Sequence, residues 1–470
     1  MSSRKMNFFF IMTLFLTLKN YPTERVQINL NNHMQKIEGW GVSLSWWAHQ
    51  VGKSFSDQQL DTLCYWLTDK DELNMNVFRY NISGGDAPRH NHMRKDAQIP
   101  GYKSSETEDY DWSQDTSQRK ILLKINRMRN DAIYEAANYS PPFWMTKSGC
   151  TAGDTLGQDN LKDDYYDEFA NYLTDVVKHY KDKYGIVFRT ISPVNEPFSN
   201  WWKINGKQEG CAFSQDNQEK IIRELYKSLK SKNMLSYSSI AVMDANSIDE
   251  CVKGLEGYAD SKGLLSCISQ INTHSYNGTK RTELLQLTKK YNKRLWQSET
   301  GPLNTKLKGF DNFLFMAKRI VTDLNVLQPV AWCDWQYMSG RFGGVWGLVG
   351  YNESSKTFER TKGYYCRKQF SKYIKPGFTI VSNNNENILS AVSPDNKELV
   401  IVIVNEDSFE KNLSVELPAN TRIVDKIPCI RTSENEDCIL LAKPPIKVGG
   451  SKIEMVSKSK SITTCIVSLK

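Results

Sequence analysis

The chain has 470 residues, of which 40% are hydrophobic and 24% are charged, so it can bury a large core and is not disordered as a whole. Its formal net charge is +8, and part of this excess lies in the first twenty residues, which contain Arg4, Lys5 and Lys19 but no acidic residue. The remaining basic excess is mild and spread along the chain, so it gives no support for a nucleic-acid-binding protein.

The N-terminus has the composition of a targeting segment. Arg4 and Lys5 precede an apolar run from Phe8 to Leu18, which has the length of a signal-peptide core and is too short to span a bilayer. We expect residues 1–20 to be a signal peptide and the protein to be secreted or extracytoplasmic. A buried N-terminal strand or helix is the alternative. No later segment has the length and apolar character of a transmembrane helix.

Between residues 35 and 374, short β-rich runs alternate with helical patterns, which is typical of βα units. Helical spacing of apolar residues is clear over 163–184, after the candidate N-cap Ser214, and over 311–324. Eight strands are expected, at 36–42, 76–80, 131–137, 187–192, 239–243, 269–273, 294–297 and 330–335. Eight such units predict an α/β fold, a (β/α)8 TIM barrel that carries the catalytic site.

Residues 375–470 lose the helical periodicity and show short alternating runs separated by turn residues, which predicts an antiparallel β-sandwich side domain. The run 25–30 also alternates, so we expect residues 21–34 to contribute an N-terminal strand to the same sandwich. All 12 tryptophans lie between Trp40 and Trp346. The large aromatic faces therefore belong to the barrel, where ligands bind in this fold.

The ten cysteines are scattered, with no CxxC motif and no Cys/His spacing typical of zinc. Cys429 and Cys438 are candidates to bracket a hairpin and to pair with each other. Most of the others are expected to be buried thiols. The sequence thus predicts neither a disulfide framework nor a metal site.

Two carboxylates directly follow expected strands. Glu196 lies in Ser-Pro-Val-Asn-Glu-Pro after the fourth barrel strand, and Glu299 follows the seventh. Side chains at the carboxyl ends of barrel strands build the active site of a TIM barrel. Glycosidic cleavage needs one carboxyl group that protonates the leaving oxygen and a second that attacks the sugar or activates water. A surface salt bridge would explain either residue alone, but both at ordered strand ends predict a catalytic pair.

Further motifs accompany this pair along the barrel. They are Gly39-Trp40-Gly41 with Ser45-Trp46-Trp47, Phe78-Arg79-Tyr80-Asn81, Ser140-Pro141-Pro142-Phe143-Trp144-Met145, His274-Ser275-Tyr276 and Trp332-Cys333-Asp334-Trp335-Gln336. Through them the chain resembles glycoside hydrolase family 30 over about residues 30 to 470, and within that family it is most similar to the endo-β-1,6-galactanases. The likeness to galactanases rests mainly on the first strand and the pair Trp46-Trp47.

The resemblance implies a retaining mechanism with Glu196 as acid/base and Glu299 as nucleophile, and it implies no metal or organic cofactor. It places Arg79 and Tyr276 against the nucleophile and Asn195 on the 2-hydroxyl of the sugar, a contact that strengthens in the transition state.

Flat sugar faces bind to aromatic side chains by apolar contact. We expect Trp335 to form the floor of the −1 subsite, and Trp144 and Trp47 are further candidates for substrate binding. His274 is expected to be either a polar contact in the site or a hydrogen-bonded core imidazole.

The resemblance favours a secreted endo-β-1,6-galactanase that acts as a monomer on the side chains of arabinogalactan. The alternative is the same machinery directed at another β-linked glycan, such as a β-1,6-glucan, a xylan or a glucosylceramide-like glycoside, because the fold does not decide the substrate. A non-catalytic carbohydrate-binding protein is a remote alternative, since both carboxylates are present.

Overall fold

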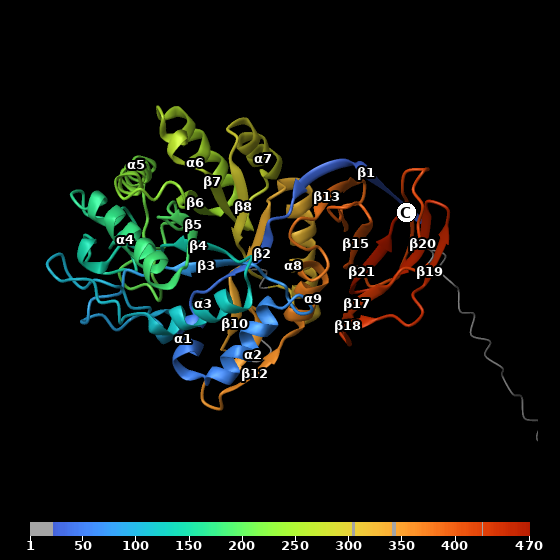
Figure 1. Ribbon diagram of the computed structural model, residues 1–470, viewed down its shortest axis with the longest axis horizontal. Helices are drawn as coiled ribbons and strands as arrows, with labels where there is room; N and C mark the ends of the chain where they lie inside the picture. The colour runs from blue at the N-terminus through green and yellow to red at the C-terminus, as the bar shows by residue number, and fades with distance from the viewer. Residues whose placement is uncertain (1–21, 303–305, 341–344, 425) are drawn as a thin grey trace, which may run out of the picture.

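The computed structural model describes residues 22–302, 306–340, 345–424 and 426–470. They form a closed eight-stranded parallel barrel and a ten-stranded sheet beside it (Figure 1). This arrangement confirms the predicted fold class. The expected signal peptide, residues 1–20, lies outside the described residues. Within the described ranges, no helix combines the length and apolar character needed to cross a membrane.

The barrel strands follow one another in chain order, and β9 pairs back with β2 to close the barrel. They are β2 (Gly39–Ser43), β3 (Val77–Asn81), β4 (Ile133–Ala137), β5 (Phe188–Ser192), β6 (Ser239–Ser247), β7 (Gln270–Asn277), β8 (Arg294–Glu299) and β9 (Ala331–Asp334). All eight expected strands are present. However, β6, β7 and β8 continue past their expected carboxyl ends, and these extensions carry most of the polar residues described below.

Helices surround the barrel, and several have clear sequence signals at their ends. Ser214 caps α5 as expected, because its Oγ accepts a hydrogen bond from the backbone N–H of Asn217 at 3.4 Å. The helices are α1 (Trp47–Ser54), α2 (Asp57–Thr68), η1 (Lys95–Ala97), α3 (Thr116–Met128), η2 (Phe143–Met145), α4 (Tyr166–Tyr184), α5 (Gln215–Ser231), α6 (Ile248–Asp260), η3 (Leu264–Cys267), α7 (Arg281–Lys290), α8 (Phe310–Thr322), η4 (Asp323–Leu327) and α9 (Lys362–Ser371). After β9, a small sheet forms from β10 (Gln336–Ser339), β11 (Gly347–Asn352) and β12 (Thr357–Arg360).

The side domain is one continuous ten-stranded sheet in the order β18-β17-β21-β15-β14-β13-β1-β16-β20-β19. The N-terminal strand β1 lies inside this sheet, antiparallel to β13 and parallel to β16. The strands are β1 (Glu24–Lys36), β13 (Thr379–Asn383), β14 (Ile388–Val392), β15 (Glu398–Asn405), β16 (Lys411–Glu416), β17 (Cys429–Ser433), β18 (Glu436–Leu440), β19 (Ile446–Gly449), β20 (Lys452–Ser457) and β21 (Ser461–Ser468).

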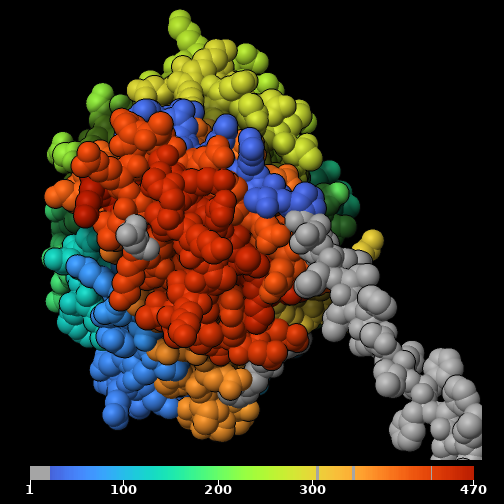
Figure 2. Space-filling model, turned by 90° about the vertical axis from the view of Figure 1, so that its right-hand side faces the viewer, coloured from blue at the N-terminus to red at the C-terminus, as the bar shows by residue number. Residues whose placement is uncertain are grey.

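Strand β15 joins the two parts through two hydrophobic cores. Successive side chains of a strand point to opposite faces of the sheet. Leu399, Ile401 and Ile403 belong to a core inside the side domain, whereas Val400, Val402 and Val404 belong to the core that contains the barrel. In Figure 2 the side domain, orange to red, covers most of one side of the molecule. The continuous apolar sequence of β15 therefore reflects burial on both faces.

The expected pairing of Cys429 with Cys438 is wrong. Cys429 forms a disulfide with Cys465, because these residues face each other in register on β17 and β21. Cys438 lies on the neighbouring strand β18 as a free thiol, and its Sγ contacts the backbone oxygen of Tyr365 at 3.1 Å. The sequence spacing indicated the hairpin of β17 and β18. It did not indicate that β21 pairs with β17 and supplies Cys465.

Candidate active site

Glu196 lies in the loop after β5, and its backbone is held from the next strand. Its N–H donates to the backbone oxygen of Asp244 at 2.8 Å. Its φ of 47° lies in the left-handed region, which costs energy for a residue other than glycine and occurs mostly at functional positions. On the side chain, Oε1 accepts from Nδ2 of Asn246 at 2.7 Å. The carboxyl group is thereby fixed at the mouth of the barrel.

Glu299 is the last residue of β8, and both of its carboxylate oxygens have donors. Oε2 lies 3.2 Å from Nη1 of Arg79, and Oε1 accepts from the Tyr276 hydroxyl at 3.1 Å. Burial raises the pKa of Glu299 to about 7, although the positive charges of His274 and Arg79 oppose this effect. The donors seen here are therefore what allows the buried carboxylate to ionise near neutral pH.

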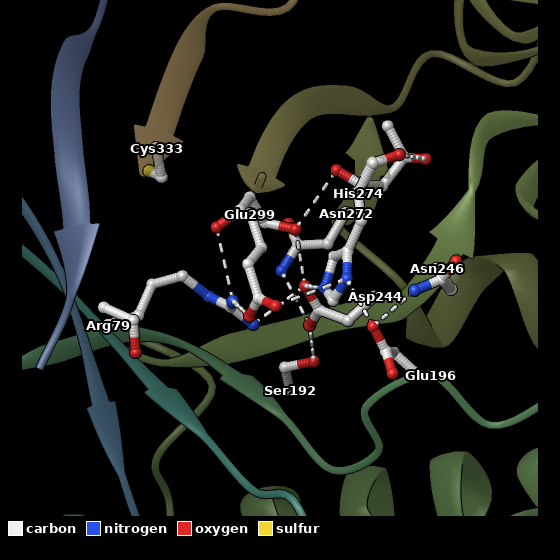
Figure 3. A network of polar contacts seen from close by, with 12 residues as sticks. Arg79, Ser192, Glu196, Asp244, Asn246, Asn272, His274, Glu299 and Cys333 are labelled. Atoms are coloured by element: carbon white, nitrogen blue, oxygen red, sulfur yellow. Dashed lines mark hydrogen bonds and ion pairs between the residues drawn. The ribbon is translucent and has the colours of Figure 1, made fainter. Parts of the chain in front are cut away.

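His274 bridges the two carboxylates (Figure 3). Its Nδ1 lies 3.2 Å from Oε1 of Glu196 and 3.6 Å from Oε1 of Glu299, and its Nε2 lies 3.5 Å from Oδ1 of Asp244. Burial would lower the pKa of His274, but the three carboxylates raise it to about 10, so the ring is a cation at neutral pH. Of the two roles considered for this residue, the structure places it in the site.

The spacing of the carboxylates restricts the chemistry. One oxygen of Glu196, one oxygen of Glu299 and one ring nitrogen of His274 all lie within 4.8 Å of one another. Retaining glycosidases have carboxyl groups about 5–5.5 Å apart, whereas inverting enzymes need about 6.5–9.5 Å to admit a water molecule. The approach of these two oxygens is compatible with the retaining arrangement.

Arg79 organises the charges beneath this pair. It is fully buried on β3 and contacts three carboxylates, those of Glu135 at 2.9 Å, Asp244 at 2.8 Å and Glu299 at 3.2 Å. Although burial opposes ionisation of Asp244, Arg79 and His274 hold its pKa well below the usual range. Asp244 also accepts hydrogen bonds from Ser192, Asn272 and Ser298. Glu299 thus shares its arginine with Glu135 and Asp244.

Several of these residues were not among the site residues predicted from the sequence. Asp244 and Asn246 lie in the extension of β6, one holding the backbone and the other the carboxyl group of Glu196. Glu135 is buried in the middle of β4. The available signals were the polar residues directly after the fifth expected barrel strand and an acidic residue inside an otherwise apolar strand.

Aromatic side chains form a wall next to Glu299. Trp335 is 9% exposed, and its ring packs edge-on against Trp46 and Tyr139, with centroid distances of 4.9 and 5.7 Å. Trp346 joins this cluster and lies 6.5 Å from the ring of Tyr276, whose hydroxyl donates to Glu299. The wall has the position and the chemistry to contact the apolar face of a sugar.

Trp47 and Trp144 do not belong to this aromatic cluster. Trp47 is 2% exposed in the core, where its Nε1 donates to the backbone oxygen of Ser43 and its ring packs on Tyr337, so it presents no face to a ligand. The neighbouring Trp46 is the residue that reaches the wall. Trp144 is half-buried and donates to the backbone oxygen of Lys103. The burial of Trp47 does not support the expected contact with substrate, whereas for Trp144 this contact stays a prediction.

The residues on either side of Glu196 point to a ligand. Asn195 is 5% exposed, and its Oδ1 has no hydrogen-bond partner among the residues that the structure describes. A buried oxygen without a partner is costly, and a sugar hydroxyl would satisfy it. Trp202 donates from Nε1 to the backbone oxygen of Glu196 at 3.1 Å, while Trp201 is 50% exposed. The exposed indole of Trp201 therefore lies in the loop that follows Glu196.

Replacing His274 with Asn is expected to shift the acid limb of the pH–kcat/KM profile to higher pH. The substitution removes a cation that lowers the pKa of Glu299, so this carboxylate loses its proton only at higher pH. The profile should be measured with an aryl glycoside over about pH 4–9. His33→Asn, on the exposed part of β1, is the matched control and should leave the limb in place. A limb that moves to lower pH would contradict the assigned charge of His274.

Comparison with known proteins agrees with this geometry. The family model described as O-glycosyl hydrolase family 30 matches residues 23–269, more than half of the chain. An endo-beta-1,6-galactanase of Hypocrea rufa is 28% identical over 398 residues, covering 79% of each chain. An exo-beta-1,6-galactobiohydrolase of Bifidobacterium longum is 22% identical, over 84% of this chain and 35% of the other. A family 30 subfamily 8 xylanase from Clostridium acetobutylicum has the same fold, with a TM-score of 0.70, 20% identity, and coverage of 94% and 99%.

Proposed function

Because the chain belongs to O-glycosyl hydrolase family 30, we propose that it is a retaining endo-β-1,6-galactanase that cleaves the side chains of arabinogalactan. The observation that supports retention is the close approach of Glu196 and Glu299, with oxygens within 4.8 Å. The support for the substrate is that two similar proteins, from Hypocrea rufa and Bifidobacterium longum, are named for action on β-1,6-linked galactose.

In the first step, Glu299 attacks the anomeric carbon while Glu196 transfers a proton to the glycosidic oxygen. The bond between this oxygen and the anomeric carbon breaks, and a covalent glycosyl ester forms on Glu299. Asn246 and His274 both contact Oε1 of Glu196 and so fix its direction. The unpartnered Oδ1 of Asn195 is available for the sugar 2-hydroxyl.

In the second step, Glu196 acts as a base. Esterification removes the negative charge of Glu299, and Glu196, now ionised, accepts a proton from the water that attacks the anomeric carbon. Glu299 then leaves as a carboxylate, which Arg79, Tyr276 and His274 stabilise from their observed positions. These residues are in place before the reaction, so stabilisation of the developing charge needs no rearrangement.

The proposal has two further parts: the enzyme cleaves inside a polymer chain, and it is secreted. The exposed Trp201, next to the loop of the acid/base, suits a chain that extends beyond the cleavage point. Secretion is proposed from the basic and apolar composition of residues 1–20. The same machinery acting on a β-1,6-glucan, a xylan or a glucosylceramide-like glycoside is the alternative.

Product analysis tests the substrate. The purified full chain should release a ladder of β-1,6-galacto-oligosaccharides from de-arabinosylated arabinogalactan, and nothing from β-1,6-glucan or glucuronoxylan in parallel reactions. If galactobiose is the sole product, the enzyme cleaves from the chain end and endo action is wrong. Activity on glucan or xylan alone would contradict the substrate and leave the two-carboxylate mechanism standing. Glu299→Gln serves as the blank in each reaction.

A further inference from the structure

Four residues with metal-binding side chains meet outside the catalytic pair. They are Asp86, His90, His92 and Cys150, and one ligand atom from each lies within 4.8 Å of all the others. The first three follow β3, and Cys150 follows β4, so two loops at the carboxyl ends of neighbouring barrel strands supply the cluster. One carboxylate, two imidazoles and one thiol in this arrangement match the ligand set of a four-coordinate zinc site.

His92 already has the orientation of a metal ligand. Its Nδ1 lies 2.6 Å from the backbone oxygen of Gly206, and its Nε2 lies 3.5 Å from Sγ of Cys150. A zinc-bound histidine typically donates its other ring N–H to a carbonyl or a carboxylate in this way. Zn–S and Zn–N bonds of about 2.3 and 2.0–2.1 Å place the two ligand atoms roughly 3.5 Å apart in a tetrahedron. The distance between His92 and Cys150 fits this value.

The other two polar ligands, Asp86 and His90, contact each other and are partly exposed to solvent. Asp86 Oδ1 lies 2.8 Å from Nδ1 of His90, and these side chains are 17% and 13% exposed. Cys150 is fully buried, and its Sγ accepts from the backbone N–H of Ala152 at 3.4 Å. A metal could therefore enter from the side of Asp86 and His90, where it would replace their mutual hydrogen bond, and reach a thiol that is already positioned.

We infer that Asp86, His90, His92 and Cys150 form a structural zinc site that ties together the loops of the catalytic face. Four protein ligands leave no position open for water or substrate, which is the arrangement of structural zinc sites. Thiolate and imidazole ligands select zinc over Mg²⁺ or Ca²⁺, which prefer oxygen. No metal was expected from the sequence, because Cys150 is far along the chain and only the His90-x-His92 spacing was a local signal.

The site also reaches the loop of the acid/base. Gly206, the partner of His92, follows β5 in the same loop as Trp202, and Trp202 donates to the backbone oxygen of Glu196 at 3.1 Å. Ile204, between them, accepts from Sγ of Cys150 at 3.4 Å. Zinc on these ligands would thus brace three successive βα loops, including the one that lines the leaving-group side of the cleft.

Metal analysis of the purified full chain tests the inference. We expect one equivalent of zinc per chain after growth with zinc, or uptake of one equivalent by EDTA-treated protein titrated with ZnCl₂ against a competing chelator. His92→Gln and Cys150→Ser should weaken zinc binding by at least about 100-fold, since even loss of an outer partner of a metal ligand costs 10–100-fold. Co²⁺ in place of zinc should give the visible bands of a tetrahedral thiolate site, and Cys150→Ser should lose the sulfur charge-transfer band.

Three controls make the outcome decisive. Cys267→Ser changes a half-buried thiol on η3 outside the cluster and should keep the zinc. Glu299→Gln should also keep it, which would exclude binding between the catalytic carboxylates. His90→Asn, at the exposed edge, replaces Cys150→Ser if that variant does not fold. If the wild type binds zinc no more tightly than His92→Gln and His90→Asn, the inference is wrong. This outcome does not depend on which glycan the enzyme cleaves.

Discussion

Glu299→Gln is expected to lower kcat by at least about 10⁵-fold, because removal of a nucleophile abolishes the covalent route. Gln keeps the shape of the side chain and an oxygen for the Tyr276 hydroxyl, so we expect the fold and substrate binding to remain. Initial rates on an aryl glycoside and on galactan measure the loss, and calorimetric titration with an oligosaccharide measures binding. Glu256→Gln, exposed on α6, is the control and should retain full activity.

Azide identifies the role of Glu299 directly. In Glu299→Ala, azide can enter the space of the missing carboxylate and attack an activated glycoside from that face. The product should be an α-glycosyl azide, with inverted configuration, because only one displacement has occurred. Normal turnover of either variant, or a β-azide from Glu299→Ala, would contradict its assignment as the nucleophile.

Glu196→Ala is expected to slow cleavage of galactan by about 10²–10⁴-fold, the range of general acid catalysis. An aryl glycoside with a good leaving group needs no proton in the first step, so its glycosylation rate should change much less. Deglycosylation still lacks its base, so a burst of phenol should precede a slow steady state. Stopped-flow traces with aryl leaving groups of different pKa measure this dependence.

Two results distinguish an acid/base from a merely structural residue. Azide should restore steady-state turnover of Glu196→Ala and give a β-glycosyl azide, since the ester on Glu299 is then attacked from the opposite face. Asn246→Ala removes a hydrogen bond to Glu196 but keeps the carboxyl group, so it should show no rescue by azide. Equal losses of Glu196→Ala on good and poor leaving groups would argue against Glu196 as the acid.

The barrel could be predicted from the sequence because each βα unit carries its own local signal. Apolar runs of period two and helical faces of period 3.6 locate the strands and helices to within a few residues. The proposed catalytic pair could be identified for the same reason, since each Glu lies shortly after an expected strand. Local signals do not show how far a strand continues into its loop, and the continuation of β6 supplies Asp244 and Asn246.

Properties that depend on contacts between distant segments were not predictable in this way. Cys465 became the partner of Cys429 through strand order in the side domain, which spacing does not reveal. Trp46 and Trp47 are adjacent in the sequence, yet one faces the aromatic wall and the other the core. The direction of each indole depends on the backbone conformation between the two residues. Composition carries no information on this conformation.

The place of β1 has a consequence for synthesis. Ile28 pairs with Asn383 and Glu24 with Leu413, so both neighbours of β1 leave the ribosome only after all eight barrel strands. At 5–20 residues per second, the first strand waits roughly 20–80 s for its partners. During this time it presents an unpaired edge, on which chains can associate wrongly. A circular permutant in which β1 follows β21 would remove the delay, and its yield of folded protein should rise most under fast overexpression.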